Sequence, residues 1–211
     1  MKDFWNSRFA LKSYVYGKKP NKFVKETLDK LNLKGKVLFP ADGEGRNSVY
    51  AATKGLEVFA FDISIEGQKK ALALAKEQNV SIIYEIINLD DLDLEKESFD
   101  AIVLVFAHFP PQLRQKYHRK LTELLVPGGI LILQGFNKEN FRLRQRSPLA
   151  GGPGNIDMLF SIEELKDDFE ELDFVEIKKE TIILREGDFH KAESSVIHLI
   201  AKKNKNVKRD N

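Results

Sequence analysis

A glycine-containing turn is the part of the sequence whose residue types most clearly favour ligand chemistry. The run PADGEGRN places Gly43 and Gly45 between an apolar stretch, 36–41, and an amphipathic one, 46–54. Between a strand and a helix, such a turn points backbone N–H groups out of the carboxyl end of a sheet, where α/β proteins bind ligands. Glycine lets the backbone approach a ligand closely and adopt positive φ. The turn therefore predicts a ligand-binding site.

An acidic residue follows at the place where an adenosine ribose would lie. Asp62 ends the next apolar stretch, 57–61, and a carboxylate there accepts hydrogen bonds from both ribose hydroxyls. Ser48 replaces the third glycine of the dinucleotide pattern G-x-G-x-x-G, which disfavours close packing around a pyrophosphate. Glu44 would also repel a pyrophosphate, whereas a cofactor that carries positive charge would tolerate it. These residues favour an adenosine cofactor over a dinucleotide.

The elements that must position these residues alternate between apolar runs and amphipathic stretches, which is typical of β-α units around a mainly parallel sheet. Strands are expected at 36–41, 57–61, 80–86, 101–106, 130–133, 173–184 and 194–202. Helices are expected at 21–31, at the edge of the sheet, and at 46–54, 65–78, 112–125 and after Ser161. Ser64 and Ser161 are predicted N-caps, the second with a capping box to Glu164. The stretch 135–160 is rich in glycine and proline and is predicted as a long loop or partial lid.

Composition limits the possible partners. The chain has 211 residues, enough for one domain, and a formal net charge of +2, which gives no reason to expect nucleic acid. It lacks cysteine, which excludes disulfides and thiolate metal sites, and four dispersed histidines form no metal motif. No apolar run approaches the roughly 18 residues of a membrane helix. We expect a cytoplasmic protein, a monomer or homodimer, without a metal, a nucleic-acid partner or a membrane partner.

A family resemblance covers the sequence from about residue 4 to residue 203. It is carried by WNSRF and YVYGKKPNKF, VLFPADGEGRNSVYAATKGLEVFAFDIS, FDAIVLVFAHFPP, LVPGGILIL, GGPGNIDMLFSIEEL and EGDFHKAESSVIHLIAKK. The sequence resembles a class I S-adenosyl-L-methionine (SAM)-dependent methyltransferase, similar to the tellurite-resistance and thiopurine methyltransferase subgroup. It departs from the family at 39–41, where Phe-Pro-Ala stands in place of the usual acidic residue near the end of the first strand.

The resemblance implies an α/β fold with a Rossmann-like, seven-stranded, mostly parallel sheet, helices on both faces and a C-terminal antiparallel hairpin. It implies a single domain over 1–211, with an N-terminal helical cap (1–34), the Rossmann-like core (35–203) and a basic tail (204–211). The cofactor would be SAM. The implied cofactor-binding residues are Ala41, Gly43, Gly45, Arg46, Asp62, Ile63, Asn88, Leu89, Phe106 and Tyr16.

Four of these residues have either a structural alternative to cofactor binding or a predicted position along the cofactor. Asn88 and Leu89 fall where the family contacts adenine, or they form a turn that ends a strand. Phe106 would lie beside the methionine part of the cofactor. Tyr16 belongs to the front segment that folds over the cofactor in similar proteins, although an aromatic ring there is equally consistent with packing at an edge.

The acceptor side is predicted from the chemistry of methyl transfer. Transfer is an in-line displacement, so a general base helps only when the acceptor loses a proton. His108, in AHFPP, is the catalytic candidate, or else it orders the turn before the two prolines. His190 and Gln134 are acceptor-side candidates. Arg144, with two neighbouring arginines, would recognise an anionic acceptor or solvate its loop.

The sequence thus predicts a methyltransferase that acts on a small-molecule acceptor: a thiol, a chalcogen oxyanion or a heteroaromatic sulfur. A SAM-binding module without catalysis and a methyltransferase acting on a macromolecule are the alternatives. A nicotinamide-dependent reductase would require the missing third glycine to be dispensable.

Overall fold

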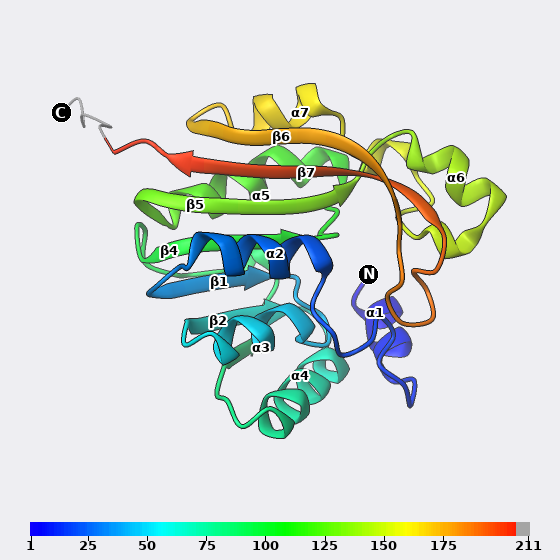
Figure 1. The fold of residues 1–211 in the computed structure, drawn as a ribbon, viewed down its shortest axis with the longest axis horizontal. Coiled ribbons are helices and arrows are strands. Elements are labelled where there is room, and N and C mark those ends of the chain that lie inside the picture. The colour runs from blue at the N-terminus through cyan, green and yellow to red at the C-terminus, as the bar shows by residue number, and fades with distance from the viewer. Residues whose placement is uncertain (206–211) are drawn as a thin grey trace.

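A computed structural model describes residues 1–205 of the chain, which form one seven-stranded sheet (Figure 1). The strand order is β3-β2-β1-β4-β5-β7-β6, and β7 runs antiparallel to both of its neighbours. The strands are β1 (Lys36–Pro40), β2 (Glu57–Asp62), β3 (Ile83–Ile86), β4 (Phe99–Val105), β5 (Leu125–Phe136), β6 (Leu172–Ile183) and β7 (Glu193–Lys203). The predicted mostly parallel sheet with a C-terminal hairpin is confirmed.

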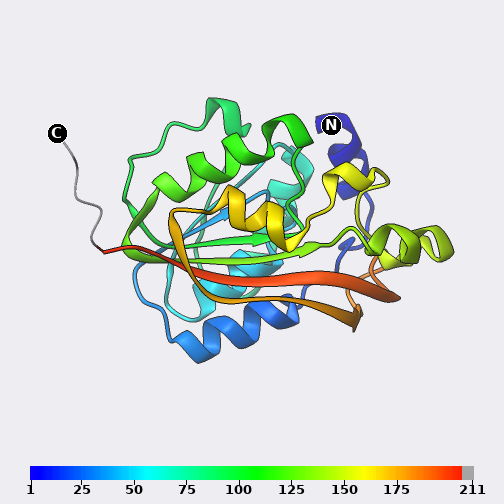
Figure 2. The same ribbon diagram turned by 90° about the horizontal axis from the view of Figure 1, so that it is seen from above.

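Helices cover both faces of the sheet, as predicted (Figure 2). The α-helices are α1 (Lys2–Phe9), α2 (Lys22–Leu31), α3 (Arg46–Thr53), α4 (Ile65–Glu77), α5 (Pro111–Glu123), α6 (Asn140–Arg146) and α7 (Ile162–Asp168). Helices α2, α3 and α4 lie on one face, and α5 and α7 on the other. Single-turn 3₁₀ helices follow β3 (η1, Leu89–Asp91) and α6 (η2, Pro148–Ala150; η3, Ile156–Met158).

The central strands are buried on both faces, because alternate side chains of a strand point to opposite sides. Val37 and Phe39 of β1 enter the core under α2 and α3, whereas Leu38 enters the core under α5 and α7. Two apolar layers therefore fix β1 and β4 in the middle of the sheet. Their carboxyl ends meet at one edge, where the glycine turn begins.

Helix α2 lies on a face of the sheet, and its predicted position at the edge is wrong. Val24 and Leu28 are buried in the same core as Val37 and Ile132. The Phe23 ring stacks on His198 of β7 with 4.1 Å between the ring centroids. An amphipathic helix needs a broad apolar surface to cover, and the face formed by β1, β4 and β5 offers one.

The segment 135–160 is more regular than the predicted loop, since β5 extends to Phe136 and α6, η2 and η3 follow. Asn140, at the start of α6, is fully buried and ties this segment to the sheet. Its side chain donates to the carbonyl of Gly151 and accepts from the backbone N–H of Ser195 in β7. Asn140 therefore joins two parts of the segment to each other and holds them against the start of β7.

Some strand boundaries differ from the prediction, because a residue can pack in the core without pairing with a neighbouring strand. Val80 and Ile82 pack beside Val49 and Leu74 without joining the sheet, so β3 begins at Ile83 rather than at 80. Strand β5 begins at Leu125 because Leu125 already pairs with Phe99 of β4. The register then shifts, and Ala101 pairs with Ile130. Most of the predicted basic tail, 206–211, lies outside the described residues.

Two further observations concern residues 1–205. Among their helices, none combines the length and the apolar character needed to cross a membrane. The same residues contain no group of three or more His, Cys, Asp or Glu side chains placed to hold a metal ion.

Candidate active site at the carboxyl edge of the sheet

The glycine turn after β1 has a left-handed backbone at three positions. Ala41, Gly43 and Gly45 have φ values of 53°, 61° and 81°. A Cβ atom on Gly45 would lie 2.5 Å from the Cβ of Ala71 in α4, and one on Gly43 would lie 2.9 Å from the Phe9 ring. Close packing against α4 and α1 thus requires glycine at both positions, in addition to any approach by a ligand.

Asp62, at the end of β2, is fixed beside this turn. Its Oδ2 accepts from the backbone N–H of Gly43 and its Oδ1 from that of Ser64, each at a distance of 3.0 Å. Burial raises the pKa of Asp62, and these backbone donors act in the opposite direction. Each carboxylate oxygen keeps a further lone pair, so the group can still accept from the hydroxyls of a ribose.

Two buried acceptor atoms near this edge have no hydrogen-bond partner among residues 1–205. They are Oδ2 of Asp42, in the glycine turn, and Oε1 of Gln134, near the end of β5. Burial raises the pKa of Asp42 to about 8. The unpaired Asp42 oxygen, beside Asp62, suits a cofactor that brings hydrogen-bond donors. The residues at this edge therefore fit SAM, which carries a ribose, an ammonium and a sulfonium.

The N-terminal segment, residues 1–21, lies over the glycine turn and is fastened there by Glu44. Glu44 Oε2 accepts from the backbone N–H groups of Val15 at 2.7 Å and Tyr16 at 3.4 Å. Its Oε1 pairs with Lys70 of α4 at 2.8 Å, and the residue is 4% exposed. The carboxylate that the sequence places beside the ligand thus also binds the segment that covers the turn.

A buried ion pair fastens the turn between β6 and β7 to the same region. Arg46 Nη2 donates to Glu186 Oε2 at 2.9 Å, and Arg46 Nη1 donates to the carbonyl of Tyr16. Asn21 Nδ2 donates to Glu186 Oε1 at 2.8 Å. The predicted cofactor residue Arg46 therefore joins three segments, and its guanidinium is already engaged by protein groups.

Aromatic rings close the site on the side of this turn. The His190 ring lies 4.5 Å from Tyr16, 5.0 Å from Phe106 and 5.4 Å from Phe136, measured between centroids. Phe106 follows β4 with a φ of 54° and stacks on Phe136 at 4.3 Å. The structure thus brings together three predicted residues, Tyr16, Phe106 and His190, around one that the sequence analysis missed, Phe136.

His108 uses both ring nitrogens to hold backbone groups. Its Nδ1 lies 2.7 Å from the carbonyl of Met158, and its Nε2 accepts from the backbone N–H of Phe136 at 3.1 Å. Burial lowers the pKa of His108 to about 4, so the ring is neutral at pH 7. Catalysis by His108 remains a prediction, while this geometry favours the alternative that His108 orders the backbone.

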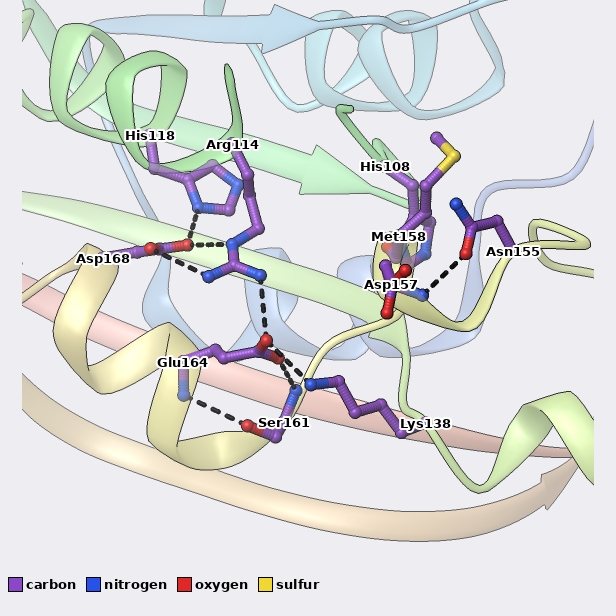
Figure 3. A network of polar contacts seen from close by, with 10 residues as sticks. All are labelled: His108, Arg114, His118, Lys138, Asn155, Asp157, Met158, Ser161, Glu164 and Asp168. Carbon is purple, nitrogen blue, oxygen red and sulfur yellow. Dashed lines mark hydrogen bonds and ion pairs between the residues drawn. The ribbon is translucent and has the colours of Figure 1, made fainter. Parts of the chain in front are cut away.

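A polar network anchors the segment that carries Met158 (Figure 3). Asp168 of α7 accepts from Arg114 Nε at 2.7 Å and contacts His118 Nδ1 at 2.8 Å, both from α5. Glu164 pairs with Arg114 and with Lys138 at 2.7 Å. Helix α7 is thereby fixed to α5 and to the end of β5, and the turn that contacts His108 is held between them.

The remaining predicted residues do not join the aromatic group through any contact described for residues 1–205. Ile63 follows Asp62, the exposed Asn88 precedes η1, and the Leu89 side chain is buried in the core. Gln134 pairs with His198 across the β5–β7 ladder and so shares its face of the sheet. Arg144 Nε donates to the carbonyl of Gly152 and holds the glycine-rich stretch after α6.

Comparisons with known proteins concern the domain and the fold. Residues 37–129 match the family model described as a methyltransferase domain. No curated protein matches the chain. A solved protein studied for the conversion of a disulfide bond into a thioacetal group during echinomycin biosynthesis is 18% identical, with a TM-score of 0.78, covering 98% of this chain and 93% of that one.

Other solved structures share the fold at similar identity. TehB from Haemophilus influenzae is 17% identical with a TM-score of 0.70, covering 96% of this chain and 67% of its own. A SAM-dependent methyltransferase from Methanosarcina mazei is 19% identical with a TM-score of 0.62, covering 81% of this chain and 93% of its own. Residues 37–129 thus form a methyltransferase domain, within a fold shared with solved SAM-dependent methyltransferases, and both findings imply S-adenosyl-L-methionine as the cofactor.

Proposed function

We propose that the chain is a SAM-dependent methyltransferase and that its acceptor is a small molecule. The observation that carries this proposal is the cover over the carboxyl edge, where the N-terminal segment is bound through Glu44 and the β6–β7 turn through the Arg46–Glu186 ion pair. A macromolecular acceptor would have to displace both segments to bring its nucleophile to the edge. A small acceptor would instead lie beneath them, beside the rings of Tyr16, Phe106 and His190.

Sulfur or another chalcogen is the acceptor atom that we propose, in a thiol, a chalcogen oxyanion or a heteroaromatic sulfur. The resemblance of the sequence to tellurite-resistance and thiopurine methyltransferases supports this choice. So does the structural relative studied for the conversion of a disulfide bond into a thioacetal. Aromatic rings also favour contact with polarizable sulfur.

The residues at the edge divide the work of positioning. When bound, SAM supplies a methyl group activated by positively charged sulfur. Asp62 would accept from the ribose hydroxyls, and the backbone of the glycine turn would lie along the cofactor. Tyr16 and Phe106 would exclude water from the reacting groups, which strengthens electrostatic interactions there.

The test is methyl transfer to a panel of acceptors. The purified chain is incubated with SAM and with aliphatic thiols, thiophenols, mercaptopyridines, selenite or tellurite, and both S-adenosylhomocysteine and the methylated product are measured by mass spectrometry. We expect turnover with at least one small acceptor. Tight SAM binding without turnover would support the non-catalytic alternative, and transfer only to added protein or RNA would support the macromolecular one.

A further inference from the structure

We infer that His190 is the general base that removes the proton of the acceptor, and that Glu186 is the residue that positions it. The inference deepens the proposed function and rests on it. It concerns acceptors that must lose a proton, such as a thiol or selenol. It also transfers the role of base from His108, which the sequence favours, to a histidine on the β6–β7 turn.

The contact between His190 and Glu186 sets which ring nitrogen carries the proton. His190 Nδ1 lies 3.1 Å from Glu186 Oε2. The side chain of Glu186 is 11% exposed, and the same oxygen also accepts from Arg46. Because an ionised carboxylate only accepts hydrogen bonds, Nδ1 of a neutral His190 must be the donor. The lone pair of the ring is then on Nε2.

The Nε2 atom of His190 is both unpaired and reachable. No described residue forms a hydrogen bond with this atom. Unlike the unpaired Nε2 atoms of His118 and His198, it is not fully buried. Gly151 packs along this edge of the ring, where a Cβ atom would lie 2.6 Å from Nε2. Tyr16 and Phe106 flank the ring. The lone pair thus lies in an aromatic wall beside the predicted cofactor residues.

The other histidines lack this combination. Both nitrogens of His108 hold backbone groups. His118 also has a carboxylate on Nδ1, but it is 0% exposed and its Nε2 is sealed in the core. His198 contacts Glu180 through Nδ1, and its ring stacks on Phe23 of α2 with Nε2 sealed. Among the four, only His190 joins an oriented ring to a reachable lone pair.

The charged and titratable groups around His190 keep it neutral and available. Burial lowers the pKa of His190, and Glu186 raises it in part. The facing groups are Glu186 on its own turn, Arg46 on α3, Arg8 on α1, Tyr16 on the N-terminal segment and His108 after β4. A neutral imidazole at pH 7 is the form that a general base requires.

The proposed step balances in atoms and charge. The thiol proton passes to Nε2 of His190, and the sulfur lone pair forms a new bond to the methyl carbon. The bond between that carbon and the sulfonium breaks, and its electron pair stays on the cofactor sulfur. The products are a thioether, S-adenosylhomocysteine and a protonated His190, stabilised by the carboxylate of Glu186 until water takes the proton.

The experiment compares His190→Gln with the wild-type chain on thiols of graded acidity. For an alkyl thiol, which is mostly protonated at pH 7, we expect kcat to fall by about a hundredfold or more. For an acidic thiophenol, which is already ionised, we expect a much smaller loss. The rate of the variant should follow the ionisation of the thiol. His198→Gln, which removes a histidine paired with glutamate on another part of the sheet, is the matched control and should keep the wild-type pH profile.

A second measurement does not depend on turnover. Nitrogen-15 NMR of the wild-type chain should show His190 as the tautomer with the proton on Nδ1, and Glu186→Gln should reduce that population. Arg46→Lys, which weakens the ion pair without touching the imidazole, should leave the tautomer unchanged. Glu186→Gln should also lower kcat for alkyl thiols more than it changes KM.

The outcomes separate the inference from the function on which it rests. A proton on Nε2 in the wild-type chain would overturn the inference, as would equal losses of kcat on alkyl thiols and thiophenols in His190→Gln. In both cases the wild-type chain would still methylate thiols, so the proposed function would stand. A wild-type chain that methylates no thiol, selenol or oxyanion would remove both.

Discussion

The guanidinium of Arg46 and the carboxylate of Glu186 meet at 2.9 Å, with side-chain exposures of 8% and 11%. Arg46 begins α3, directly after the glycine turn, and Glu186 lies in the turn between β6 and β7. Their contact joins the start of the parallel sheet to the C-terminal hairpin. Removing one partner of a buried ion pair leaves the other charge uncompensated, so this contact should control how firmly the edge of the sheet is closed.

Glu186 should make the stability of the chain depend on pH in the acid range. Burial acts to raise its pKa, but Arg46 and His190 outweigh that effect and lower it to about 2. Because the folded pKa lies below the unfolded value, the stabilisation is complete above about pH 5 and is lost as the pH falls towards 2. We expect Glu186→Gln to remove about 2–3 kcal/mol of this pH dependence, measured by urea unfolding from pH 2 to pH 7. The exposed Glu163→Gln is the control, and parallel curves for wild type and Glu186→Gln would contradict the prediction.

Asp62→Ala should weaken SAM binding by about 1–3 kcal/mol, because it removes the proposed acceptor of the ribose hydroxyls. The substitution also frees the backbone N–H groups of Gly43 and Ser64. Isothermal titration calorimetry with SAM measures the change, and Asp167→Ala, an exposed carboxylate on α7, controls for lost charge. An unchanged affinity would mean that the ribose binds elsewhere.

Asp42→Asn should stabilise the cofactor-free chain at alkaline pH. The pKa of Asp42 is raised by burial to about 8, so the folded state holds a proton that the unfolded state releases above pH 4. The stability of the wild type therefore falls between about pH 4 and pH 8, and the neutral amide lacks this loss. Melting temperatures from pH 5 to pH 9 should show the variant gaining on the wild type as the pH rises. A difference in melting temperature between variant and wild type that does not vary with pH would contradict the raised pKa of Asp42.

Gly45→Ala should destabilise the fold by about 1–3 kcal/mol, since the new methyl group would lie 2.5 Å from the Cβ of Ala71 and φ is +81°. Ala71→Gly removes the facing methyl group and should recover the steric part, while the backbone strain remains. A double-mutant cycle by chemical unfolding measures the coupling between the two positions. Purely additive effects would show that α3 and α4 do not press together there.

His108→Gln should loosen the turn at η3 and cost about 1–3 kcal/mol, because Met158 and Phe136 each lose a buried partner. Hydrogen exchange should accelerate at residues 156–160. The pKa of His108 is lowered by burial to about 4, so the wild type loses stability as the pH falls from about 6.5 to 4, a loss that the variant lacks. Unchanged exchange at 156–160 would argue against this role.

The features that could be predicted from the sequence are those that depend on neighbouring residues. Ser64 accepts from the backbone N–H of Gly67, and Ser161 forms the predicted capping box with Glu164. The burial of β1 on both faces likewise follows from its run of consecutive apolar residues. The local pattern also predicts the glycine turn and Asp62 as neighbours, because both end adjacent parallel strands.

The features that escaped prediction connect distant parts of the chain. Glu186 and Arg46 are 140 positions apart, and no local pattern marks the glutamate as buried. The face covered by α2 depends on an apolar surface formed by β1, β4 and β5, which exists only once the sheet is assembled. The sequence favours His108 over His190 as a base, and only the contacts of their ring nitrogens in the fold favour His190 instead.

The hydrogen bonds that attach the N-terminal segment to Glu44 bear on how this protein can be redesigned. Its two hydrogen bonds come from the main chain of Val15 and Tyr16, so the identity of those side chains does not enter the contact. Tyr16 can therefore be exchanged to reshape the proposed acceptor site while the N-terminal segment stays bound, with proline as the exception because it lacks the N–H group. In this segment, the choice of acceptor can therefore be altered through the side chain without altering the main-chain contacts that hold the segment over the glycine turn.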